Sequence, residues 1–168
     1  MTIKVIELRK ITIKKKLLNK SEKLFIFLGL LGLFPFFIGL LDLLINKNNF
    51  FFVVHLPKYY GSIILTFLGA IYWGSILNLV RKSLVPEQIK FCIIIWSVIP
   101  SILAITILTM KSNFSLLLLS MSFLLCQLVD EICYKFLLFP SWYLPLRRTL
   151  TLFVVLILIY SYFIMQTP

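Results

Sequence analysis

Histidine and acidic residues are scarce in this chain of 168 residues, and that scarcity excludes several kinds of site. His55 is the only histidine, so the chain by itself cannot form a multi-histidine metal site or hold haem between two histidines. Cys92, Cys126 and Cys133 lie in or beside apolar runs, without the close paired spacing of a metal-binding or redox motif. We therefore interpret them as buried free thiols, and we expect no metal and no cofactor.

Groups that could perform catalysis are equally scarce. The chain has six Asp and Glu residues, and a headgroup transferase would need a cluster of carboxylates to hold metal ions. A protease or acyltransferase would need a histidine beside a nucleophile, or a facing pair of acids. Asp130 and Glu131 are adjacent, but neighbouring side chains on a helix diverge by about 100° and cannot share one site. We therefore expect that the protein is not an enzyme.

Apolar residues are abundant, since 61% of the chain is hydrophobic and the mean hydropathy is +1.03. A helix needs about 20 apolar residues to cross a bilayer, and the chain contains five such runs. We predict an all-α membrane protein, a bundle of five transmembrane helices in one membrane domain (24–168) that follows a basic segment (1–23). Pro35 should kink the first span, and residues 46–60 should form a short loop along the interface. The predicted spans are 24–45, 61–80, 91–110, 114–134 and 149–165.

Small or short polar residues recur at every fourth position from Tyr59 to Asn78. Positions four apart share one helix face, so these residues should form a narrow seam between large apolar side chains. Such seams let helix backbones approach closely in lipid, and we predict that this helix is the packing centre of the bundle. A second small patch flanks Pro100 in the third span, which should pack on the second. The residues of the two patches are Ser62, Thr66, Ala70, Gly74, Asn78, Ser97 and Ser101.

The densest polar group of the chain lies near the end of the fourth span. A polar helical stripe leads from mid-membrane to one membrane surface, and it consists of Ser120, Gln127, Asp130 or Glu131, and Tyr134. Arg147 and Arg148, at the start of the fifth span, return to the same surface. Two interpretations stay open: Asp130 forms a structural ion pair with an arginine, or the stripe lines a path for a solute or lipid.

The net charge of +11 comes from basic residues that flank apolar runs. They do not form one basic face with interleaved aromatics, so we expect no nucleic-acid partner. The first segment should lie on the lipid bilayer and bind anionic lipid headgroups, or it remains solvated and only orients the first helix. The basic residues that would contact the headgroups are Lys14, Lys15, Lys16, Lys20 and Lys23.

Basic residues are divided unevenly between the two ends of the predicted bundle. Fourteen of the 17 Lys and Arg residues lie in the first segment and in the loops after the second and fourth spans. Positive charge is retained on the cytoplasmic or matrix side of a membrane. We therefore predict that the N-terminus is inside and the C-terminus outside.

Several short motifs, spread over most of the chain, resemble one known family. The most specific block lies in the second span, where Tyr72 stands at a position at which we expect His in many relatives. The chain resembles the uncharacterised membrane-protein family that includes transmembrane protein 69 of animal mitochondria and short proteobacterial inner-membrane proteins. The resemblance implies five helices and an inner membrane, either the bacterial cytoplasmic or the mitochondrial inner membrane, and it supplies no activity. The matching residues are Gly32, Pro35, Phe36, Tyr60, Gly61, Leu65, Phe67, Leu68, Gly69, Trp73, Gly74, Ser97, Val98, Pro100, Ser101, Asp130, Pro140, Trp142, Tyr143 and Arg147.

Two functions fit these features. The small-residue patches and the missing catalytic groups favour a non-enzymatic subunit or assembly partner of a membrane complex, whose partners would be other membrane-protein subunits. The alternative is a small carrier or lipid-binding membrane protein that uses the polar stripe of the fourth helix, because ionisable groups within a membrane are commonly functional.

Overall fold

The computed structural model describes residues 19–45, 50–80, 86–134 and 139–166, and every helix or strand element within these ranges is an α-helix. Five segments of the described chain are long and apolar enough to cross a membrane. The predicted all-α class and the five membrane helices are confirmed. The first segment is divided in two, and the helices are α2 (Lys20–Leu31), α3 (Phe34–Ile45), α4 (Phe50–Val80), α5 (Glu87–Thr109), α6 (Phe114–Tyr134) and α7 (Tyr143–Ile164).

The first membrane segment breaks between α2 and α3. α2 ends at Leu31, and Pro35 is the second residue of α3, where its missing N–H leaves no helical hydrogen bond unmade. In one continuous helix, Pro35 would have left the Leu31 carbonyl without its donor. We predicted a kink at Pro35, and the structure shows a full break just before it. The Gly32 carbonyl in this break accepts a hydrogen bond from Tyr60 Oη at 3.1 Å.

α4 is longer than predicted. It begins at Phe50, so residues 50–60, which we expected to belong to an interfacial loop, are helical. Pro57 is buried against Gly39 of α3, where an added Cβ would lie 2.9 Å from the proline ring. Lys58 donates a hydrogen bond to the backbone carbonyl of Met110, just past the end of α5. The loop prediction was wrong because these contacts stabilise a proline and a lysine within the helix.

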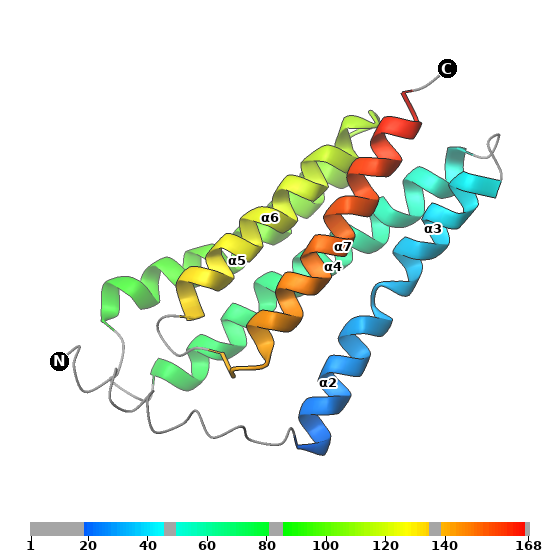
Figure 1. Ribbon diagram of the computed structural model, residues 1–168. Coiled ribbons are helices and arrows are strands. Elements are labelled where there is room, and N and C mark those ends of the chain that lie inside the picture. The colour runs from blue at the N-terminus through cyan, green and yellow to red at the C-terminus, as the bar shows by residue number, and fades with distance from the viewer. Residues whose placement is uncertain (1–18, 46–49, 81–85, 135–138, 167–168) are drawn as a thin grey trace.

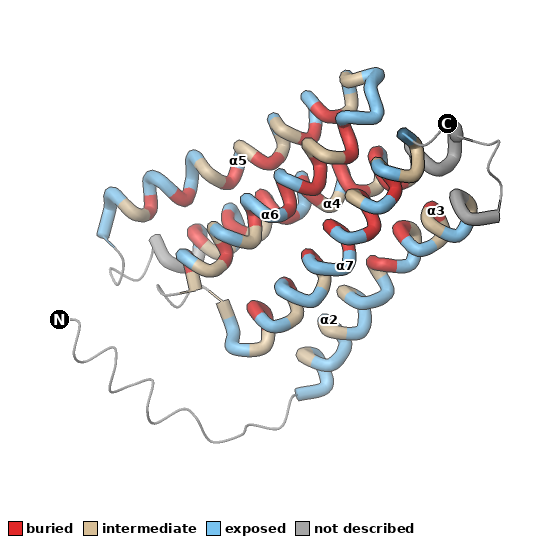
Figure 2. Tube along the Cα trace, turned by 45° about the horizontal axis from the view of Figure 1, so that its top comes forward, coloured by how far each residue is buried: buried red, intermediate tan, exposed pale blue. Residues whose placement is uncertain are grey.

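The five membrane segments run alternately up and down in a bundle, with α2 and α3 forming the two parts of the first segment (Figure 1). α4 contacts α3, α5, α6 and α7, and α7 also contacts α2, α3 and α6. The starts of α2, α5 and α7 lie at the same end as the ends of α4 and α6. Buried residues face the inside of the bundle, and many large apolar residues are exposed on its outside (Figure 2). An apolar outer surface is what contact with lipid tails requires.

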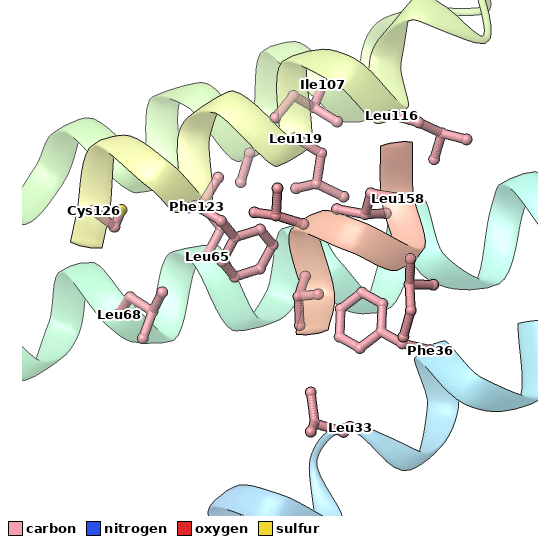
Figure 3. Packing of buried hydrophobic residues seen from close by; sticks show 14 residues of the cluster. Leu33, Phe36, Leu65, Leu68, Ile107, Leu116, Leu119, Phe123, Cys126 and Leu158 are labelled. Atoms are coloured by element: carbon pink, nitrogen blue, oxygen red, sulfur yellow. The ribbon is translucent and has the colours of Figure 1, made fainter. Parts of the chain in front are cut away.

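The apolar core joins all five membrane segments (Figure 3). Phe36 of α3 is fully buried, and its ring meets Tyr60 of α4 and Phe123 of α6 edge-on, with centroids 5.4 and 6.5 Å away. Ile107 of α5 and Leu158 of α7 belong to the same cluster. The core therefore fixes how α6 and α7 lie beside α4, and these three helices carry the polar residues of the site.

Candidate functional site

A buried ion pair joins α6 to α7. Arg147 Nε lies 2.8 Å from Asp130 Oδ2, and the two side chains are 6% and 2% exposed. Asp130 is one turn before the end of α6, and Arg147 is one turn after the start of α7. The pair therefore joins the end of α6 to the start of α7.

The other carboxylate oxygen of Asp130 binds two tyrosines. Tyr72 Oη of α4 donates a hydrogen bond to Asp130 Oδ1, and Tyr143 Oη of α7 donates to the same oxygen over 3.5 Å. Asp130 thus connects α4, α6 and α7. Tyr72 and Tyr143 were not among the predicted site residues. The signal for Tyr72 was a polar ring in an apolar helix, at the position where we expect His in related sequences.

A second, more exposed pair lies beside the first. Arg148 binds Glu131 with both Nε and Nη2, at 2.6 and 2.7 Å, and these side chains are 61% and 35% exposed. Gln127 Nε2 donates to Glu131 Oε1 at 3.0 Å, and Thr151 Oγ1 donates to Gln127 Oε1 at 3.3 Å. The polar stripe of α6 therefore faces α7, and the structure brings together all five residues of the predicted polar site.

The two ion pairs differ in what their loss would cost. Removing one partner of a buried pair leaves the other charge uncompensated and costs about 3–5 kcal/mol, whereas an exposed pair contributes about 0–1 kcal/mol. Asp130 and Arg147 therefore dominate the cluster energetically. The arrangement links three helices through one carboxylate, and it favours the structural interpretation of Asp130.

The predicted helix-packing seam is only partly buried. Ser62 of α4 and Ser97 of α5 are buried, and Ser101 is half-buried, but Thr66, Ala70 and Gly74 are exposed. The side chain of Asn78 lies outside the described residues. For contacts within the chain, the prediction was therefore wrong at the three exposed positions.

Helix geometry explains the error. Since a helix has 3.6 residues per turn, positions four apart drift by about 40° at each step, and Gly74 lies about 120° from Ser62 around α4. The closest approach to α5 uses Gly69 instead, because a Cβ there would overlap with the backbone carbonyl of Ser97. α4 lies at the centre of the bundle, but it packs through a face next to the predicted one.

Other predicted groups have separate locations. Lys20 and Lys23 are exposed on α2, whereas Lys14, Lys15 and Lys16 lie outside the described residues. Cys126 and Cys133 are buried free thiols, but Cys92 is exposed on the outside of α5, which corrects the prediction that it is buried. Within the described ranges, no group of three or more His, Cys, Asp or Glu residues could hold a metal ion.

An apolar cavity of about 520 Å³ lies between the divided first segment, α4 and α7. Arg147 and Thr151 are among its lining residues, and the wall is otherwise mostly apolar. Phe25 of α2 stacks on Trp142, just before α7, with ring centroids 5.7 Å apart, and both residues line the cavity. Because Arg147 also binds Asp130, the cavity adjoins the buried ion pair, and Phe123 of α6 is part of its wall.

One family model matches the chain. It covers residues 21–163, and its description is "Protein of unknown function (DUF3429)". The chain belongs to the DUF3429 family. The DUF3429 match includes the polar cluster of α6 and α7 and nearly all of the five membrane segments. No curated protein and no solved structure matches the chain.

Proposed function

We propose that the protein is a non-enzymatic subunit or assembly partner of a complex in a bacterial cytoplasmic or mitochondrial inner membrane. The observation that carries this proposal is the exposed small-residue face of α4, formed by Thr66, Ala70 and Gly74. An added Cβ at Gly74 would meet no atom of the described chain within 4 Å. In lipid, a face of this kind permits close approach of another helix.

The occupant we propose for this face is one transmembrane helix of another membrane protein. Large exposed side chains, Phe67, Trp73 and Leu77, are interleaved with the small residues, so a partner helix would contact apolar side chains as well as the small positions. Helices associate in lipid through such close packing, because lipid tails are already as apolar as Leu. Since α4 also contacts four other segments of the chain, a partner bound here would contact the central helix.

The membrane and the orientation belong to the same proposal. The resemblance to the family of transmembrane protein 69 supports an inner membrane, and the excess of basic residues at one end supports an N-terminus inside and a C-terminus outside. The basic first segment would contact anionic headgroups on that inner side. No nucleic-acid partner, cofactor or catalytic role is part of the proposal.

The test is to extract the tagged protein from its native membrane in mild detergent, run a native gel and identify comigrating proteins by mass spectrometry. We expect a discrete large band with stoichiometric partners. Gly74→Ile fills the small-residue face and should release the partners. Cys92→Leu enlarges an exposed residue on α5 and should leave the band unchanged. A lone monomer or homo-oligomer from the wild-type chain would refute the proposal.

A second candidate function is a small carrier or lipid-binding protein. The observation that favours it is the position of Arg147, which binds Asp130 and also lines an apolar cavity. If the candidate is correct, lipid should remain bound to the purified protein after extensive washing in detergent. Lipid-free protein that keeps its stability would count against it.

A further inference from the structure

We infer that the cavity beside α7 binds one membrane phospholipid with an anionic headgroup, with an acyl chain inside the cavity and a lipid oxygen facing Arg147. The inference deepens the second candidate function and rests on it. The cavity volume of about 520 Å³ falls within the range of about 300–1,000 Å³ that is typical of ligand pockets.

Arg147 supplies the polar end of the site. Its Nε binds Asp130, but its Nη2 has no hydrogen-bond partner among the described residues, although the side chain is only 6% exposed. A buried donor without a partner is costly, and such groups in native structures call for an explanation. Arg147 lines the cavity beside Thr151, and its Nη2 is itself covered, so a turn of the guanidinium group toward the cavity would bring this donor to a phosphate or ester oxygen of a lipid.

The inner wall of the cavity suits an acyl chain. Leu33, Phe36, Leu68, Phe123 and Val154 line it and are buried in the apolar core. A chain of methylene groups leaves no polar atom unpaired against such a wall. A partner helix is a poorer fit. One turn of a helix about 10 Å across fills roughly 400 Å³, so a cavity of about 520 Å³ would hold little more than one turn.

The cavity reaches the end of the bundle where α2 and α7 begin, because Phe25 and Trp142 line it there. Tryptophan is typical of the headgroup level of a membrane. Arg147 lies five residues after Trp142, about 7 Å along the helix, which suits the phosphate and ester oxygens below a headgroup. Lys20 and Lys23 are exposed in the first turn of α2, at this end of the bundle, and favour an anionic headgroup.

Two pairs of variants test the site. Ile64 lines the cavity, and Ile64→Trp should fill it, whereas Ile63→Trp makes the same change at the neighbouring exposed residue. Arg147→Lys keeps a cation for Asp130 but removes Nη2, and Arg148→Lys is its control on the exposed pair. If Ile64→Trp does not fold, Leu150→Phe fills the same cavity from α7.

The full-length chain is purified, mixed with phosphatidylglycerol or phosphatidylcholine, and analysed for bound lipid by native mass spectrometry. We expect the wild-type protein to retain one phosphatidylglycerol and to bind phosphatidylcholine more weakly. The two cavity variants, Ile64→Trp and Arg147→Lys, should bind phosphatidylglycerol about tenfold more weakly than the wild type, which is equivalent to about 1.4 kcal/mol. Both control variants should bind as the wild type does.

Each contrary result has a separate meaning. Wild-type protein that retains no lipid would refute this site together with the second candidate function. Lipid binding that both cavity variants keep would refute the site alone. Equal retention of the two lipids would overturn the anionic headgroup. Loss of a comigrating protein from Ile64→Trp, with lipid retained, would make a partner helix the occupant and overturn the proposal.

Discussion

Asp130 contacts side chains that are far apart in the sequence, since Tyr72 is 58 residues before it and Arg147 is 17 residues after it. The ion pair with Arg147 could be predicted, because the two residues belong to consecutive spans whose neighbouring ends lie at the same surface. The bond from Tyr72 could not be predicted in the same way. It depends on the rotation of α4 against α6, which core packing decides.

Replacing Asp130 tests whether the buried pair is structural. Asp130→Asn leaves Arg147 charged and buried without its partner, and it should lower the free energy of unfolding by about 3–5 kcal/mol. Glu131→Gln is the matched control at the neighbouring residue, and it should cost about 1 kcal/mol or less because its pair is exposed. The membrane yield and the thermal stability in detergent are measured for both variants. Normal yield and stability of Asp130→Asn would contradict the structural role.

The close approach of α4 and α5 gives a second prediction about single residues. Gly69→Ala places a methyl group against the backbone carbonyl of Ser97, which cannot rotate away, so we expect a loss of about 1–3 kcal/mol. Gly74→Ala meets no atom within 4 Å, and the higher helix propensity of alanine should stabilise the isolated chain by up to about 1 kcal/mol. Thermal unfolding of the two variants, compared in one detergent, checks the contrast. Equal melting temperatures would show that α4 and α5 lie further apart.

Helix α4 shows what a sequence pattern can and cannot predict about an element. Its apolar length predicted a membrane helix. Its small residues predicted that this helix is the packing centre of the bundle, and α4 contacts α3, α5, α6 and α7. The packing face was misplaced because spacing by four residues does not follow a turn of 3.6 residues. The buried residues Leu65, Leu68, Tyr72 and Ile76 follow steps of three, four and four residues, whose mean stays close to one helical turn. Large side chains occupy much of this face, so small size alone did not reveal it.

One hydrogen bond from α4 reaches the break between α2 and α3. Tyr60→Phe keeps the ring but removes the donor to the Gly32 carbonyl, and it should cost about 0.5–1.5 kcal/mol. Hydrogen exchange at the backbone amides of residues 29–37 should become faster, because the break is less well fixed. Tyr59→Phe is the matched control, since Tyr59 is the neighbouring residue and is exposed. Unchanged exchange in Tyr60→Phe would mean that Pro35 alone fixes the break.

At the scale of the whole molecule, hydropathy was sufficient to predict the number of membrane segments. Each segment must satisfy its own backbone hydrogen bonds in lipid, so a long apolar run has few alternatives to a helix. The cavity beside α7 was not predictable, because its wall combines residues from four membrane segments that are separate in sequence. Neither hydropathy nor helical periodicity specifies how far apart such helices pack.

The distribution of charge over the two ends of the bundle predicts its orientation in the membrane. One end carries the basic residues at the starts of α2, α5 and α7, and the other carries Lys58 and Lys111. Retention of positive charge inside would place the start of α5 inside and the turn between α5 and α6 outside.

Two variants, each with one exposed residue replaced by cysteine, test this orientation. Asn113→Cys should react with a membrane-impermeant maleimide in intact cells, whereas Gln88→Cys should react only after the membrane is permeabilised. The unmodified chain is the control, because Cys126 and Cys133 are buried and Cys92 lies on a span. The reverse labelling pattern would place the basic end outside. The contacts proposed for Lys20 and Lys23 with anionic lipid would then have to form in the outer leaflet, and the charge bias would no longer support them.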